Sequence, residues 1–198
     1  MREADVTLTD FGLAALCFGF TGVLIGGGDI AALFAGLYAA LGVAALLGAL
    51  SHGWFWDRTR DIGRATWLVT MLVIGGANLF LWLISARAFA VTAPWGAVIA
   101  FGQFALYASL ALFITRSFLL SSGFSLPPTL ALLAGFLWTG NWLGATGLAV
   151  ALAGAVQQAA GIRGLGLTHN ALYHVIQALA FILVYLAVPD LAASLEAR

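Results

Sequence analysis

The chain has 198 residues, of which 63% are hydrophobic and 8% charged, with a formal net charge of zero and a mean hydropathy of +1.04. A soluble domain carries about 25% charged and about 45–50% apolar residues, so this composition indicates an integral membrane protein. The balanced charge argues against a nucleic-acid partner. All eight cationic side chains are arginines, which excludes a Schiff-base lysine such as retinal proteins use.

Apolar segments long enough to cross a bilayer, about 20 residues each, follow one another along the chain. In chain order we expect spans at 6–25, 30–51 and 62–86, one that begins after Pro94 and ends at 114, and three more at 118–138, 142–160 and 167–188. The fifth is the weakest, because Pro127 and Pro128 interrupt it; if that stretch is re-entrant, the count falls to six. The prediction is an all-α, polytopic bundle of seven transmembrane helices that forms a single domain over residues 1–198.

The arginines set the orientation of this bundle, since an excess of Lys and Arg marks the cytoplasmic side. With seven spans, two arginines (Arg87 and Arg198) fall on one side of the membrane. The other six fall on the opposite side: Arg2, Arg58, Arg60, Arg64, Arg116 and Arg163. We therefore expect a cytoplasmic N-terminus and an external C-terminus. The absence of lysine beside abundant alanine, glycine and arginine is typical of a bacterial protein, so we expect the membrane to be a bacterial inner membrane.

The three histidines of the chain are the main candidates for function. His52 ends the second predicted span, and His169 and His174 begin the seventh, so the seven-span topology places all three near the cytoplasmic face. Ionisable residues at membrane depth are costly and indicate a functional site by default. Three imidazoles are also a common ligand set of catalytic zinc, with water in the fourth position.

The segment around His52 allows two interpretations. Its tryptophans and Arg–Asp pairs are typical of an interfacial loop. Alternatively, Asp57 or Asp61 returns toward His52 at the start of the third span and orients a metal-bound water or accepts its proton.

The segment around His174 also allows two interpretations. His169 and His174 are five residues apart, or about 140° around a helix, which suits shared metal ligation less well than a spacing of four. Packing or support of another ligand is the alternative for this pair. Thr168 is positioned to cap the helix by accepting from a backbone N–H two or three residues later.

This arrangement resembles the CREST superfamily of seven-helix membrane proteins, which includes alkaline ceramidases and adiponectin receptors. His52 is similar to the second-span histidine of that family, His174 to the last histidine of its seventh-span pair, and Asp57 or Asp61 to its third-span aspartate, with Asp61 nearer the helix start. Two positions depart from the pattern. The family serine four residues before the first histidine is Gly48 here, with Ser51 directly before His52 instead, and the first histidine of the seventh-span pair is Asn170. The resemblance implies a divergent prokaryotic member.

What the resemblance implies is a zinc-dependent intramembrane hydrolase that acts on a lipid-like amide or ester taken from the bilayer. Zn²⁺ would be held by His52, His169 and His174, with Asp61, Asp57 and Ser51 as the catalytic candidates. The alternative is a non-enzymatic receptor, sensor or transporter on the same scaffold, with a structural metal or none. A haem protein with two axial histidines is a third hypothesis, for which nothing else in the sequence marks a porphyrin pocket.

Overall fold

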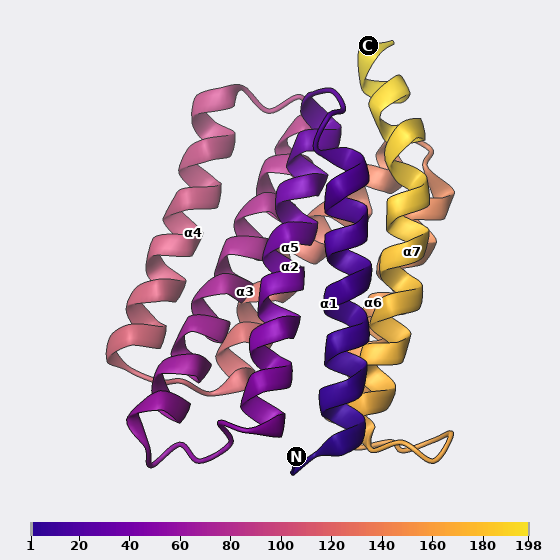
Figure 1. The fold of residues 1–198 in the computed structure, drawn as a ribbon. Coiled ribbons are helices and arrows are strands. Elements are labelled where there is room, and N and C mark those ends of the chain that lie inside the picture. The colour runs from indigo at the N-terminus through magenta and orange to yellow at the C-terminus, as the bar shows by residue number, and fades with distance from the viewer. Residues whose placement is uncertain (1, 198) are drawn as a thin grey trace.

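In the computed structural model, which describes residues 2–197, the chain folds into seven helices that run up and down one bundle (Figure 1). The bounds are α1 (Ala4–Leu24), α2 (Asp29–Gly53), α3 (Asp61–Ala88), α4 (Ala93–Phe113), α5 (Phe118–Trp138), α6 (Trp142–Ala159) and α7 (His169–Glu196). The predicted all-α class and the seven helices are confirmed. Helices suit an apolar solvent because each satisfies its own backbone hydrogen bonds.

Six of the seven helices are long and apolar enough to cross a membrane. The helix outside this set is α6, which has 18 residues and carries Gln157 and Gln158 in its last turn. The sequence had marked a different helix as the weak one. Instead, α5 runs through Pro127 and Pro128 without a break, so the re-entrant alternative is wrong.

A hydrogen bond from α4 explains how α5 tolerates Pro128. Pro128 has no N–H, so it leaves the carbonyl of Phe124, four residues earlier, without its helical donor. Gln103 of α4 supplies that donor, since its Nε2 lies 2.6 Å from the Phe124 oxygen. The Gln103 Oε1 in turn accepts from Nε1 of Trp82 at 2.6 Å, which ties α3 to the same point. This repair by a neighbouring helix is how membrane helices accommodate proline.

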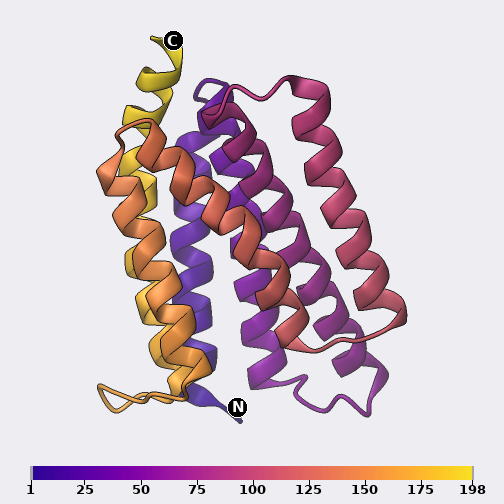
Figure 2. The ribbon, with the colours of Figure 1, turned by 180° about the vertical axis from the view of Figure 1, so that it is seen from behind.

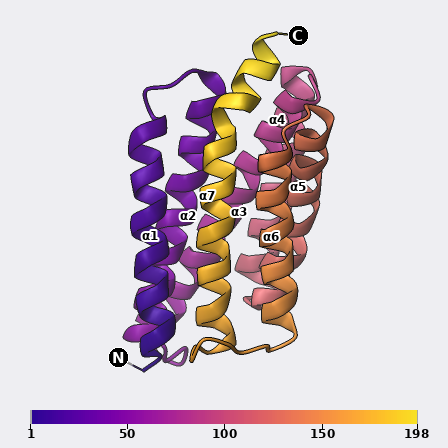
Figure 3. The same ribbon diagram turned by 90° about the vertical axis from the view of Figure 1, so that its right-hand side faces the viewer.

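The helices form a layered arrangement with α3 near the middle. α3 packs against α2, α4 and α5, whereas α4 lies at the outer edge. Figure 2 shows α5 crossing obliquely from the α4 side to the side of α6 and α7. α7 lies between α1 and α6 (Figure 3), and it packs against both.

Aromatic side chains fill the contact between α1, α2 and α7. Phe20 stacks on Tyr185 with ring centroids 4.1 Å apart, and it meets Tyr38 edge-on. The Tyr38 hydroxyl is buried and donates to the Phe181 carbonyl at 2.9 Å. This core fixes the rotation of the three helices about their axes, and so fixes which polar side chains face one another nearer the N-terminus.

The N-terminus, the end of α2 and the start of α7 lie at one end of the bundle, the lower end in Figure 1. We call it the N-terminal end. The loops 54–60, 114–117 and 160–168 lie there too. Thr168 caps α7 as expected, since its hydroxyl accepts from the Ala171 N–H, and the Thr168 N–H donates to Asp5 of α1 at 2.9 Å.

Candidate functional site

A buried carboxylate–imidazole pair joins α1 to α7 near the N-terminal end. Oδ1 of Asp10 lies 3.3 Å from Nε2 of His174, and the two side chains are only 6% and 12% exposed. The other ring nitrogen of His174, Nδ1, lies 3.1 Å from the Thr9 hydroxyl. Both nitrogens of this histidine therefore have partners on α1.

Gly48 of α2 forms the third wall around Asp10. A Cβ at this position would lie 2.9 Å from Oδ2 of Asp10 and 3.3 Å from its Cγ, so the glycine admits the carboxylate against the α2 backbone. Gly48 is also where the CREST pattern has its serine. In this chain the space beside the helix holds a carboxylate that comes from α1.

His52 lies one turn further along α2, at the N-terminal end. Its Nδ1 is 2.5 Å from Oε2 of Glu3, and the two side chains are 26% and 47% exposed. His52 also lies close enough to His174 to interact with it electrostatically. The predicted meeting of the ends of α2 and α7 thus brings two of the three histidines into one region.

Ser51 is fully buried, and its hydroxyl has no hydrogen-bond partner within residues 2–197. It lies three residues after Gly48, on the same side of α2. A buried hydroxyl with no partner costs free energy, because nothing replaces its hydration. Ser51 is therefore a buried polar group one turn from Gly48, without a hydrogen bond of its own.

His169 is the first residue of α7, and its backbone carbonyl accepts from Gln157 of α6 at 3.2 Å. Its neighbour Asn170 accepts from Gln158 at 3.1 Å. The start of α7 is thus bonded to α6, while His174, more than one turn later, is bonded to α1. The bond of His169 is made by its backbone, and its side chain forms no hydrogen bond or ion pair within residues 2–197.

The two carboxylates predicted near His52 have local partners. Asp57 accepts from the Thr59 N–H at 2.9 Å and from the Thr59 hydroxyl at 2.6 Å. These bonds hold the pKa of Asp57 below its usual value. Asp61 is 94% exposed and pairs with Arg64. In this structure both bind neighbours in sequence rather than a histidine.

The fit to zinc is partial. Two ligands bound to one tetrahedral zinc at about 2.0–2.1 Å lie roughly 3.3 Å apart, and the nearest atoms of Asp10 and His174 have this separation. Among the described residues, however, no group of three or more His, Cys, Asp or Glu side chains is arranged to hold a metal ion. The donors present supply two ligands, and a catalytic zinc site needs three.

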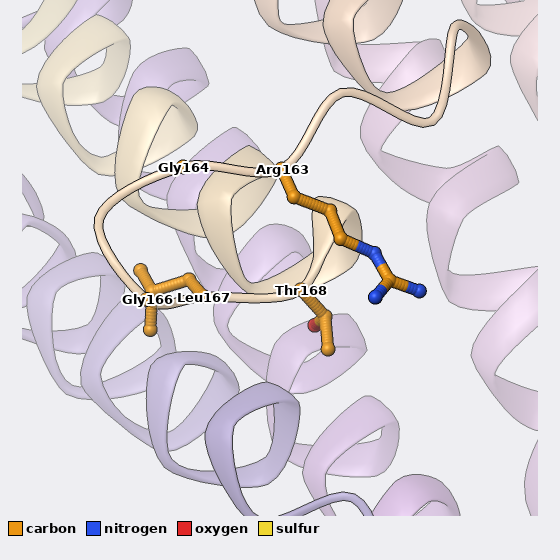
Figure 4. Close-up of a pocket in the computed structure, with 5 residues that line it drawn as sticks. All are labelled: Arg163, Gly164, Gly166, Leu167 and Thr168. Atoms are coloured by element: carbon orange, nitrogen blue, oxygen red, sulfur yellow. The ribbon is translucent and has the colours of Figure 1, made fainter.

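A hollow of about 380 Å³ opens in the loop that precedes α7. Figure 4 shows it beside Arg163 and Thr168. The Thr168 N–H is already bound to Asp5, so the anion-binding start of α7 is satisfied from within the chain.

Sequence reasoning missed Asp10, the residue that contacts both α7 and α2. The signal was present, because Asp10 is the single charged residue between 6 and 25, the first predicted span. An isolated carboxylate inside an apolar segment is as costly as a histidine and deserves the same weight. Thr9 was missed as well, and nothing in its type or spacing singles it out.

The chain belongs to the DUF6962 family, a family of unknown function, whose family model matches residues 6–193. The match runs from the start of α1 to near the end of α7 and includes the Asp10–His174 pair. No curated protein and no solved structure matches the chain.

Proposed function

We propose that this member of the DUF6962 family is an integral membrane protein whose seven helices all lie in the bilayer, with the N-terminal end in the bacterial cytoplasm. The support is the charge asymmetry: Arg2, Arg58, Arg60, Arg64, Arg116 and Arg163 gather at that end, and Arg87 ends α3 at the other. Arginine-rich ends face the cytoplasm. α6 crosses with the others because it runs antiparallel along α7 (Figure 3).

The working centre that we propose is the Asp10–His174 pair, which binds and releases a proton. The Thr9 hydroxyl has one hydrogen, and it lies 2.9 Å from the Asp5 carbonyl and 3.0 Å from the Val6 carbonyl. When Thr9 donates there, its oxygen accepts from Nδ1–H of His174. Nε2 of a neutral ring is then an acceptor, so its contact with Asp10 requires one further proton, carried on the carboxyl or on the imidazole.

This proton accounting favours a non-enzymatic membrane sensor or transporter. A shared proton leaves the two side chains either both neutral or as an ion pair with no net charge, and this lowers the cost of holding ionisable groups at membrane depth. Pairs of this kind form proton relays in transport proteins. The observation that carries the proposal is the contact of 3.3 Å between two side chains that are each at most 12% exposed.

Infrared difference spectroscopy on the reconstituted protein tests this function. Stepping the pH should change a carboxylic-acid C=O band that is absent in Asp10→Asn and shifted in His174→Gln. The matched control is Asp190→Asn, because Asp190 is an exposed carboxylate near the other end of α7. If the band persists in Asp10→Asn, or no carboxyl band responds to pH in the wild type, the proposal is wrong.

A second candidate is the zinc-dependent hydrolase of lipid amides or esters that the CREST resemblance implies. The separation of Asp10 and His174 and the unpartnered hydroxyl of Ser51 favour it, whereas the lack of a third ligand disfavours it. Elemental analysis of protein purified without chelators separates the two. Stoichiometric zinc that is lost in both Asp10→Asn and His174→Gln would establish the metal centre, and less than a tenth of an equivalent in a folded sample would remove it.

A further inference from the structure

Two arginines from different loops meet at one tryptophan at the N-terminal end. The Arg58 guanidinium of loop 54–60 lies 4.1 Å from the ring centroid of Trp67. The Nε1–H of the same indole donates to the backbone carbonyl of Arg116 in loop 114–117 at 2.7 Å. Trp67, on the first turns of α3, therefore contacts both loops, one through the Arg58 guanidinium and the other through the backbone of Arg116. We call Arg58, Trp67 and Arg116 the tryptophan clamp.

The nearby carboxylates are already engaged. Asp57 pairs with Arg60, Asp61 with Arg64, and Glu3 with His52. Glu3 still attracts Arg58 at longer range, without a direct contact. Within residues 2–197 neither arginine of the clamp has an ion-pair partner, and one terminal nitrogen of Arg58 is buried with no acceptor. An unpaired cation in each of two adjoining loops, one of them with an unbonded donor, favours binding of an anion.

The surroundings of the clamp are apolar and exposed. Phe118 contacts the Trp67 ring, with centroids 6.4 Å apart. Beside Arg116 in the sequence, Ile114 is 74% exposed and Leu119 is 78% exposed. Cationic side chains suit lipid headgroups, and exposed apolar side chains suit acyl chains. A patch that combines the two at a helix end therefore suits the boundary between headgroups and acyl chains.

We propose that the tryptophan clamp binds the phosphate of an anionic phospholipid headgroup in the leaflet at the N-terminal end. The guanidinium groups of Arg58 and Arg116 donate to the phosphate oxygens, since guanidinium geometry suits phosphate. The acyl chains lie along Ile114 and Leu119. This inference does not depend on the Asp10–His174 proposal, because it uses different residues from different helices.

Lipid titration followed by native mass spectrometry tests the site on the full chain in detergent micelles. An arginine at an anionic surface contributes about 1 kcal/mol, or roughly fivefold in affinity. Arg58→Gln and Arg116→Gln should each weaken phosphatidylglycerol binding by about fivefold. They should weaken phosphatidylcholine binding less, because the choline cation offsets the phosphate charge. Arg87→Gln is the matched control, because Arg87 lies in the last turn of α3, at the opposite end of the bundle.

Two further measurements keep the result decisive. Thermal unfolding of each variant shows whether it is folded. If Arg58→Gln does not fold, Arg116→Gln still tests the site, because the indole bonds to the Arg116 backbone, which the substitution retains. Inorganic phosphate at millimolar concentration should not displace the lipid. Equal binding of phosphatidylglycerol by wild type and both variants, an equal loss in Arg87→Gln, or displacement by free phosphate would overturn the proposal.

Discussion

The close approach of Gly48 to Asp10 yields a sharp prediction for Gly48→Ala. The new Cβ would lie 2.9 Å from Oδ2 of Asp10, whereas ordinary contacts begin at 3.4 Å. The carboxylate must therefore withdraw by about half an ångström. Its contact with His174 is already 3.3 Å, beyond the usual range for an N–H···O bond. A shift that lengthens this contact separates the pair.

The expected cost combines two terms. Overpacking a tight site costs about 1–3 kcal/mol. Interhelical hydrogen bonds in membranes contribute about 0.6 kcal/mol on average and about 1.7 kcal/mol at most. The alanine also gains up to about 1 kcal/mol from helix propensity, so we expect Gly48→Ala to lower the free energy of unfolding by about 1–4 kcal/mol. The same substitution should also weaken the pH-dependent carboxyl band of Asp10.

The measurement is denaturant unfolding in mixed micelles, with Gly12→Ala as the control. Gly12 lies within one helical turn of Asp10, and a Cβ there meets nothing within 4 Å. Gly12→Ala should therefore leave the stability unchanged or raise it by up to about 1 kcal/mol through helix propensity. In an Asp10→Ala background the clash disappears, and Gly48→Ala should then cost little. A cost below about 0.5 kcal/mol in the wild-type background, or an equal cost in both backgrounds, would refute the reasoning.

Two other predictions concern the framework. Gln103→Leu should lower the free energy of unfolding by about 1–3 kcal/mol, because the Phe124 carbonyl loses its donor. Adding Pro128→Ala should recover part of this loss in unfolding experiments, because it restores a backbone N–H. If the double variant shows no recovery, Gln103 does not have this role. Thr59→Val should raise the pKa of Asp57 toward its ordinary value of 3.8, because the hydroxyl bond that lowers it is lost. A carboxyl whose pKa is lower in the folded than in the unfolded chain stabilises the fold at pH values above its unfolded pKa. This stabilisation is lost as the pH falls through the lowered pKa of the folded state. The unfolding free energies of wild type and variant should therefore differ near neutral pH and converge in acid. NMR titration of the Asp57 carboxyl carbon measures the shift, and an unchanged pKa would exclude the role of Thr59.

The sequence by itself determined the class and the order of the chain. Hydropathy is a property of each segment alone, so it located seven helices, although it marked the proline-containing α5 as the weak one instead of α6. Alternation of direction then brought His52 and the start of α7 to one end. Thr168 capped α7 for a local reason too, since a cap depends on residues within one turn.

Only the tertiary structure decided which polar side chains meet. Successive helical residues differ by about 100° in direction, so contact depends on the rotation of each helix about its axis. That rotation is set by distant packing such as Phe20 on Tyr185. It turns Asp10 onto His174, whereas the bond of His169 to α6 is made by its backbone carbonyl. The hydropathy of a segment carries no information about the rotation of its helix. The sequence therefore predicted at which end of the bundle each histidine lies, but not which side chains it contacts.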